Sequence, residues 1–238
     1  MSLMSLRNEG KVAIISMDNG KNANNLEFSR QLLSLLKQAE EEKSNKALIL
    51  TSSDEKNWSQ GIDVPWMMGS IQSGNHDDVK EFLHTMDACY TVMMQYPMPI
   101  IAAINGHTFG NACVLACACD FRFMRSDRGF FCFPEVDMSV PFLPGLMDVI
   151  LKAMPIYRFN EMILSGRRLS AEELKADKVI DQSFEGADAL FEGALAYAKT
   201  FTKGRAIFSE HKRRLHKPAI DALAGKNPPL IDAMKVLL

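Results

Sequence analysis

The hydrophobic pattern of this 238-residue chain alternates between short apolar runs and longer amphipathic stretches. Residues 11–17, 47–51 and 100–104 are apolar runs of strand length. Between them, residues 26–43 and 77–95 carry apolar side chains at helical spacing, which predicts an amphipathic helix in each interval. This order of strands and helices predicts an α/β fold.

The second half of the chain begins with the same alternation and ends in helices. Residues 110–119 are apolar on nearly every face, which predicts a buried helix. Further strands are predicted at 121–125, 130–133 and 179–184, and further helices at 145–154, 156–165 and from 170 onward. From residue 186 the pattern is helical. We therefore expect a core over residues 4–185 and a C-terminal helical region over residues 186–238, with residues 1–3 left outside the fold.

Polar segments separate the predicted strands and helices in the first half of the chain. Asn24 is followed by Glu27 three residues later, which fits a capping box, so we expect Asn24 to cap the first helix. Residues 57–63 form a predicted loop after a strand. The small polar residues at 70–75 predict a second, mobile loop.

Composition and charge exclude several classes of protein. The apolar content of 47%, the charged content of 24% and the net charge of −2 are ordinary for a globular protein and give no reason to expect nucleic-acid binding. No apolar run approaches the ~20 residues needed to span a membrane. The chain also lacks a basic start followed by an apolar run, the pattern of a secretory signal. We expect a cytoplasmic protein without a membrane partner.

The five cysteines all fall in one apolar region of the chain, residues 89–132. The spacing C-x3-C-x-C at 113–119 fits no common zinc pattern, and His107, the one histidine close to that segment, has no usual ligand offset. We expect free, buried thiols and no metal site.

The residues most indicative of chemistry lie where a strand meets a helix. Residues 104–114 predict the end of a strand, a turn, and a helix that opens near Gly110 and Asn111. Backbone N–H groups at a helix start have no intrahelical partner and suit developing negative charge. The segment Ser59–Asp63 contains a second joint of this kind, with Ile62 after its glycine. The two joints are candidates for a pair of N–H donors that face one cleft.

These two joints and two later motifs resemble the crotonase superfamily, also called the enoyl-CoA hydratase/isomerase family. The later motifs are residues 134–137 (PEVD) and 164–173 (LSGRRLSAEE), and the resemblance extends over nearly the whole chain. It implies a spiral of ββα units with a C-terminal helical part that builds trimers, often paired into hexamers. It also implies an acyl-CoA thioester substrate. Because coenzyme A is part of that substrate, no separate cofactor is expected.

The resemblance also assigns roles by motif position. It implies that the backbone N–H groups of Ile62 and Asn111 are the two donors of an oxyanion hole. Backbone atoms of the first joint would meet the adenine of coenzyme A, and these residues are Ser59, Gln60, Gly61, Ile62 and Asp63. In the basic segment near the C-terminus, Lys212 and Arg213 are candidates for contacts with its phosphates.

Two positions at which the family's enzymes can have a glutamate distinguish the activities that the resemblance implies. The family's hydratases use two glutamates to activate water across a conjugated double bond. This chain keeps one, Glu135, and has Val114 in place of the other, and a valine cannot exchange a proton. One carboxylate still suffices to take a proton from C2 and return it at C4, which the resemblance implies for Δ3,Δ2-enoyl-CoA isomerases. We therefore expect Glu135 to shift a 3-enoyl-CoA double bond to the 2-position.

Two other functions remain open from the sequence. Asp137 stands two residues after Glu135 and could replace the missing acid of a hydratase. The chain could also be a non-catalytic acyl-CoA-binding protein of the same fold. Of the neighbouring polar residues, His107 is expected to be a packed turn residue and Asp120 to pair with nearby backbone.

Overall fold

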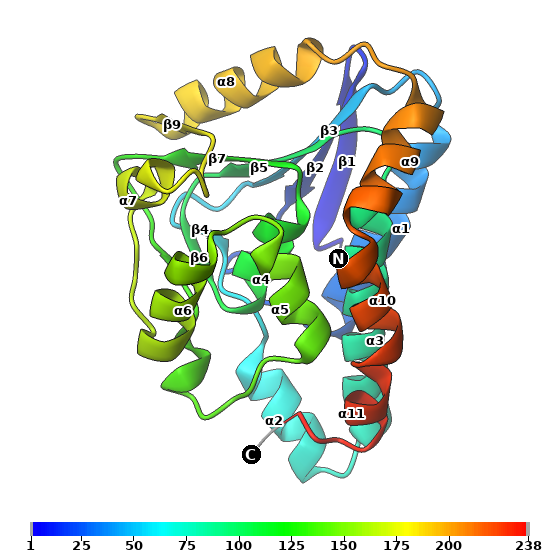
Figure 1. Ribbon diagram of the computed structural model, residues 1–238, viewed down its shortest axis with the longest axis vertical. Coiled ribbons are helices and arrows are strands. Elements are labelled where there is room, and N and C mark those ends of the chain that lie inside the picture. The colour runs from blue at the N-terminus through cyan, green and yellow to red at the C-terminus, as the bar shows by residue number, and fades with distance from the viewer. Residues whose placement is uncertain (1, 237–238) are drawn as a thin grey trace.

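Two β-sheets form the centre of the computed structural model, which describes residues 2–236 (Figure 1). The larger sheet has the strand order β1-β2-β3-β5-β7-β9, and the smaller has the order β4-β6-β8. β1 and β2 are antiparallel, whereas the other pairs of named strands are parallel. The strands are β1 (Met4–Glu9), β2 (Val12–Met17), β3 (Ala47–Ser52), β4 (Asn57–Ser59), β5 (Ile100–Ile104), β6 (His107–Phe109), β7 (Phe121–Arg125), β8 (Phe131–Cys132) and β9 (Gln182–Phe184).

Consecutive strands enter the two sheets in turn. β3 is followed by β4, β5 by β6 and β7 by β8, and in each pair the first strand joins the larger sheet and the second the smaller. Helices then complete each unit: α2 (Val64–Gln72) and α3 (His76–Met94), α4 (Asn111–Ala118), and η1 (Pro134–Val136) with α5 (Pro144–Leu151). This arrangement confirms the predicted spiral of ββα units.

The interior strands β2, β3 and β5 are largely apolar because helices cover both faces of the larger sheet. α8 (Ala187–Lys199) packs on one face, where it meets Ile14 of β2 and Ile49 of β3. The next residues along these strands, Ile15 and Leu50, point to the opposite face, towards α1 (Leu26–Glu41) and α3. The sheet therefore separates two apolar layers, and α4 is buried in the larger of them.

The C-terminal region is helical, as expected. α9 (Arg205–Leu215), α10 (Lys217–Gly225) and α11 (Pro228–Asp232) follow one another along the side formed by α1 and α3 (Figure 1). α10 packs on α5 and on α3. The domain boundary at 185/186 stays a prediction, and residues 237 and 238 of the predicted region lie outside the described residues. No helix within residues 2–236 has the length and apolar character to cross a bilayer.

Several elements differ from the sequence-based expectation. β4 and β6 have three residues each, too few to show a period of two, and they replace a predicted loop and turn. β1 was not predicted, and α2 extends to Gln72, into the segment 70–75 expected to be a mobile loop. The predicted strand at 179–184 is confined to β9.

The prediction that Asn24 caps the first helix is wrong by one residue. The side chain of Asn25 accepts the hydrogen bond from the N–H of Phe28, at 3.1 Å. Glu27 binds Gln31 on the helix surface instead of closing a capping box. Asn24 is displaced from the capping position because its backbone pairs with Ile62 as an isolated β-bridge, and it is fully buried there.

Candidate active site

The two predicted strand-to-helix joints lie in contact. β4 and β6 are parallel neighbours in the smaller sheet, so the joints that follow them leave from the same edge. Gly61 has a φ of +75°, and a Cβ placed on it would overlap the carbonyl oxygen of Phe109 and lie 3.1 Å from the backbone N of Asn111. Only glycine lets the first joint approach the second this closely.

The N–H groups of Ile62 and Asn111 are both without an acceptor. Asn24 pairs with the residues on either side of Ile62: its N–H donates to the carbonyl of Gly61 at 2.7 Å, and its carbonyl accepts from Asp63 at 2.9 Å. Asn111 is the first residue of α4, where no intrahelical acceptor exists. Within residues 2–236, neither N–H donates a hydrogen bond. Both groups are therefore available to an oxygen with developing negative charge.

Both joints open into one cavity, which Ile62 lines from the first joint and Asn111 from the second. Most of its lining is apolar, from α2, α3, the segment before α5 and the end of the described chain. The lining residues are Ile62, Met67, Leu83, Asn111, Glu135, Val140, Pro141, Phe142, Leu143, Leu146 and Val236. A second hollow shares Glu135 and both joints and adds Gln60, Val64 and Met138. The site thus combines a pair of N–H groups with an apolar chamber suited to a hydrocarbon chain.

Glu135 projects into this cavity from the 3₁₀ turn η1. Burial raises the pKa of its carboxyl from 4.5 to about 7. Its Oε2 is buried without a hydrogen-bond partner among residues 2–236, and its Oε1 lies 2.8 Å from where a Cβ on Gly110 would be. Gly110 has a φ of +56°, so the glycine that opens α4 also makes room for the carboxyl. A carboxyl with a pKa near neutrality can take up and return a proton.

Glu135 is the one ionisable side chain that lines the cavity in the described part of the chain. Val114 is fully buried in α4 and belongs to the hydrophobic core. Asp137 is exposed, is absent from the lining of the cavity, and lies beside Gly166, where a Cβ would be 2.5 Å from its Oδ2. The structure therefore does not bring Asp137 into the cavity beside Glu135.

The residues predicted to contact coenzyme A divide into two groups. Gln60 and Ile62 line the hollow. Ser59 and Asp63 have structural contacts: the Ser59 hydroxyl donates to the carbonyl of Asn22 at 2.7 Å, and the Asp63 side chain caps α2. No part of the described structure tests the contact of Ser59, Gln60, Gly61, Ile62 or Asp63 with an adenine, which stays a prediction.

The basic residues proposed for the phosphates are engaged elsewhere. Lys212 is buried, and its Nζ lies 2.7 Å from Oδ2 of Asp120, which also accepts from the backbone N–H of Ile100. Arg213 forms an ion pair with Glu210 on the same helix. Asp120 thus pairs with backbone as expected, and in addition holds Lys212 inside the fold.

The sequence interpretation missed two residues next to the site, Asn24 and Tyr90. The Asn111 side chain accepts from the hydroxyl of Tyr90 at 2.6 Å and donates to Oδ1 of Asn24 at 3.1 Å. Tyr90 was assigned only to the apolar face of a helix. A phenol on such a face needs a buried partner for its hydroxyl, and this was the one signal available in the sequence.

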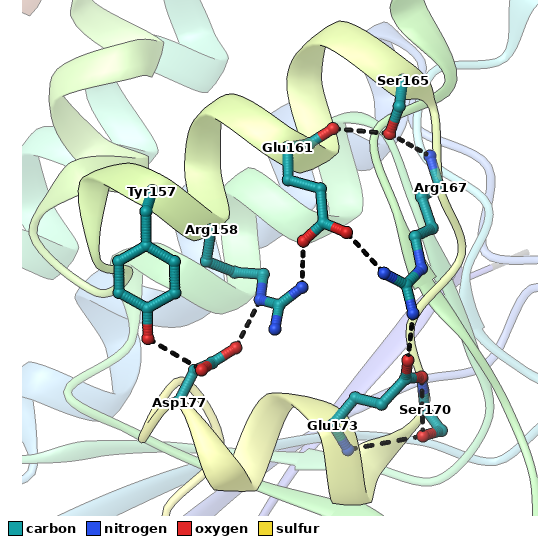
Figure 2. A network of polar contacts seen from close by, with 8 residues as sticks. All are labelled: Tyr157, Arg158, Glu161, Ser165, Arg167, Ser170, Glu173 and Asp177. Atoms are coloured by element: carbon teal, nitrogen blue, oxygen red, sulfur yellow. Dashed lines mark hydrogen bonds and ion pairs between the residues drawn. The ribbon is translucent and has the colours of Figure 1, made fainter.

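A charged network supports the loop behind η1. α6 (Ile156–Ser165) contacts η1, and Figure 2 shows how α6 is tied to α7 (Ala171–Ala176). Arg158 bridges Asp177 and Glu161, and Arg167 bridges Glu161 and Glu173. At the start of α7, Ser170 and Glu173 form the predicted capping box. The motif at 164–173 thus serves to hold the helix on which η1 rests.

Comparison with known proteins supports the assignment suggested by this geometry. The model of the family described as enoyl-CoA hydratase/isomerase matches residues 7–227. Enoyl-CoA delta isomerase 3 of Arabidopsis thaliana is 30% identical over 176 residues, which cover 71% of each chain. The peroxisomal enoyl-CoA delta isomerase 2 of the same plant is 28% identical over 64% of each chain. The mitochondrial Δ(3,5)-Δ(2,4)-dienoyl-CoA isomerase of mouse is 27% identical over 75% of this chain and 56% of its own.

Solved structures share the fold over almost the whole chain. An enoyl-CoA hydratase/isomerase family protein from Pseudomonas syringae superimposes with a TM-score of 0.87 at 20% identity, covering 98% of both chains. The human mitochondrial Δ3-Δ2-enoyl-CoA isomerase gives a TM-score of 0.86 at 20% identity, covering 97% of this chain and 90% of its own.

The fold and the site together define an α/β spiral protein of the crotonase type. The matched family model spans nearly the whole chain, from residue 7 to residue 227. The chain belongs to the enoyl-CoA hydratase/isomerase family, as its motifs predicted. Its relatives include isomerases and a carnitinyl-CoA dehydratase, and two of them are named as peroxisomal and mitochondrial. The reaction and the location within the cell are therefore not decided by membership alone.

Proposed function

We propose that this protein is a Δ3,Δ2-enoyl-CoA isomerase in which Glu135 is the only acid/base. The observation that supports the proposal best is that no other ionisable side chain lines the cavity within residues 2–236. Shifting a double bond needs one group that moves one proton, and a single carboxyl with a pKa of about 7 meets that requirement.

In the proposed reaction, Glu135 removes a proton from C2 of a 3-enoyl-CoA. The electron pair moves into the thioester carbonyl and creates a dienolate, whose oxygen accepts hydrogen bonds from the N–H groups of Ile62 and Asn111. Each such donor contributes on the order of 3 kcal/mol to transition-state stability in other enzymes. The protonated Glu135 then returns the proton at C4, the electron pair re-forms the carbonyl, and the double bond lies between C2 and C3.

Two further features belong to the same proposal. The backbone of Ser59–Asp63 would receive the adenine of coenzyme A, leaving the acyl chain in the apolar chamber. The protein would act as a homotrimer or as a pair of trimers, with the C-terminal helices forming the interface.

The test uses the full chain and a 3-enoyl-CoA such as trans-3-hexenoyl-CoA. Isomerisation is followed by the rise in absorbance of the conjugated thioester. Glu135→Gln should lower the rate at least about 10³-fold because the amide cannot exchange a proton. Asp137→Asn is the matched control, since it makes the same chemical change two residues away and outside the cavity, and it should retain activity within about twofold.

Other outcomes would assign a different function. If Glu135→Gln keeps most of the activity, Glu135 is not the acid/base. Hydration of crotonyl-CoA that is lost in Asp137→Asn would favour the hydratase with a substitute acid. If acyl-CoA binds but neither 3-enoyl nor 2-enoyl thioesters are converted, the chain is a non-catalytic binding protein.

A further inference from the structure

A continuous chain of buried hydrogen bonds passes behind the two N–H donors. It begins at the hydroxyl of Tyr90, which donates to Oδ1 of Asn111 at 2.6 Å. The amide of Asn111 then donates to Oδ1 of Asn24 at 3.1 Å. The amide of Asn24 donates onward to the carbonyl of Asn22 at 3.1 Å and to the hydroxyl of Ser59 at 3.3 Å. All four side chains and the residue Asn22 are buried, so each of these bonds is shielded from water.

In each of these hydrogen bonds, the donor and the acceptor are fixed by the chemistry of the two groups. Tyr90 can only be the donor to Asn111 Oδ1, because the amide of Asn111 donates to Asn24. Burial raises the pKa of Tyr90 well above its ordinary value, so the hydroxyl keeps its proton at any working pH. Ser59 in turn accepts from the N–H of Gly61 at 3.2 Å, which brings the chain to the first joint.

Asn24 is the point at which the two joints meet. Its backbone N–H and carbonyl bind Gly61 and Asp63, the residues on either side of Ile62, and thereby orient the peptide of Ile62. Its side chain binds the side chain of Asn111, the residue that carries the other donor. α4 has no side-chain cap at its start, so these contacts restrain its first residue.

We propose that Asn24 and Tyr90 are positioning residues that set the spacing and direction of the two N–H donors. The inference rests on the proposed function, because it gives those donors the task of stabilising an enolate. It also gives the side chain of Asn111 a role, because its bonds to Tyr90 and Asn24 restrain the residue that carries the donor. Neither Asn24 nor Tyr90 lines the cavity, so the two residues act through Ile62 and Asn111 rather than on the substrate.

The expected effect follows from the strict geometry of such donors. A shift of a few tenths of an ångström weakens a hydrogen bond to the enolate more than it weakens binding of the uncharged substrate. Tyr90→Phe should lower kcat by about threefold to thirtyfold, and Asn24→Ala by about tenfold to a hundredfold, with KM changed by less than about threefold. A Tyr90→Phe/Asn24→Ala double variant should lose little more than Asn24→Ala, because both changes interrupt one chain.

The experiment needs controls that break similar bonds away from the site. Tyr96→Phe matches Tyr90→Phe, because Tyr96 is buried and its hydroxyl donates at 2.6 Å to the carbonyl of Leu36. Asn45→Ala matches Asn24→Ala, because Asn45 is buried and its amide donates to the carbonyl of Ala39. These controls should lose a similar amount of thermal stability without a fall in kcat.

The second readout does not require turnover. Acetoacetyl-CoA is a 3-oxoacyl thioester that can bind as its enolate, which absorbs in the near ultraviolet. A pH titration of the bound compound reports how strongly the two donors stabilise a negative oxygen. We expect Tyr90→Phe and Asn24→Ala to raise the apparent pKa of the bound compound by about half a unit or more, and the two controls to leave it unchanged.

The outcomes separate this inference from the proposed function. If wild type does not isomerise 3-enoyl-CoA, the proposed function fails. The titration of bound acetoacetyl-CoA then tests by itself whether Tyr90 and Asn24 position the two donors. Unchanged kcat and an unchanged enolate titration in Tyr90→Phe would overturn the inference even if Asn24→Ala does not fold. Equal losses in the Tyr90 and Tyr96 variants would also overturn it, because the effect would then be one of stability alone.

Discussion

The buried carboxyl of Glu135 should make the folded protein less stable as the pH rises. Its pKa is raised from 4.5 to about 7 in the folded state because burial disfavours the charged form. Below pH 4.5 the group is neutral in both states and contributes no difference. Between 4.5 and 7 the unfolded chain loses its proton while the folded protein keeps it, so stability falls over this interval. Above about pH 7 both states are charged and the full difference is present.

The size of this effect follows from the same shift. A change of 2.5 units, from 4.5 to 7, corresponds to about 3 kcal/mol at pH 8, and the same shift corresponds to about 1 kcal/mol or less at pH 5. Glu135→Gln removes the buried charge. We therefore expect the variant to gain stability over wild type while it loses activity. This gain in unfolding free energy should be larger at pH 8 than at pH 5 by about 2–3 kcal/mol.

The assay is denaturant unfolding of wild type, Glu135→Gln and Asp137→Asn at both pH values. For a chain of this length, about 2–3 kcal/mol also corresponds to a rise of roughly 4–12 °C in Tm. Asp137→Asn serves as control because it removes an exposed carboxylate from the same loop. A Glu135→Gln variant whose gain is the same at pH 5 and pH 8 would refute the reasoning that a buried, unpaired charge destabilises the site.

Three further predictions concern catalysis and assembly. The ratio kcat/KM should rise with pH and level off above about 7, because Glu135 must be ionised to take the first proton; a profile flat from pH 5 to 9 would contradict this. Gly61→Ala should lower kcat at least about a hundredfold, measured in the isomerase assay, because the new Cβ overlaps Phe109 and the backbone has a positive φ. Ile207→Glu with Leu215→Glu, both exposed on α9, should lower the mass measured by light scattering to that of the monomer; an unchanged mass would place the interface elsewhere.

Local sequence patterns indicated the two joints, and the family resemblance supplied the roles expected of Ile62, Asn111 and Glu135. The glycines before Ile62 and Asn111 marked two places where a strand ends and backbone N–H groups are left without acceptors. The two joints were candidates for N–H donors that face one cleft, and the structure brings them into contact because β4 and β6 are parallel neighbours. The apolar pattern of residues 110–119 likewise identified α4 as buried. Each of these inferences needed only neighbouring residues.

The features that were missed depend on residues far apart in the chain. Asn24 and Asn111 are 87 positions apart, and in the sequence Asn24 fits a helix cap as well as its neighbour does. Lys212 was grouped with a run of basic residues, whereas its partner Asp120 lies 92 positions away and takes it into the interior. Polar side chains can bind any suitable group in three dimensions, so their partners do not follow from a local pattern.

The position of Glu135 on η1 has a consequence for how such a site can diverge. The two N–H groups belong to joints locked by the smaller sheet, and altering them would disturb the whole spiral. Glu135 stands instead on a short turn in the connection between β8 and α5, which carries no sheet pairing. The carboxyl that we propose as proton carrier could therefore move or be replaced while the two N–H groups stay in place. One scaffold could in this way carry a different reaction when side chains change around the same two backbone donors.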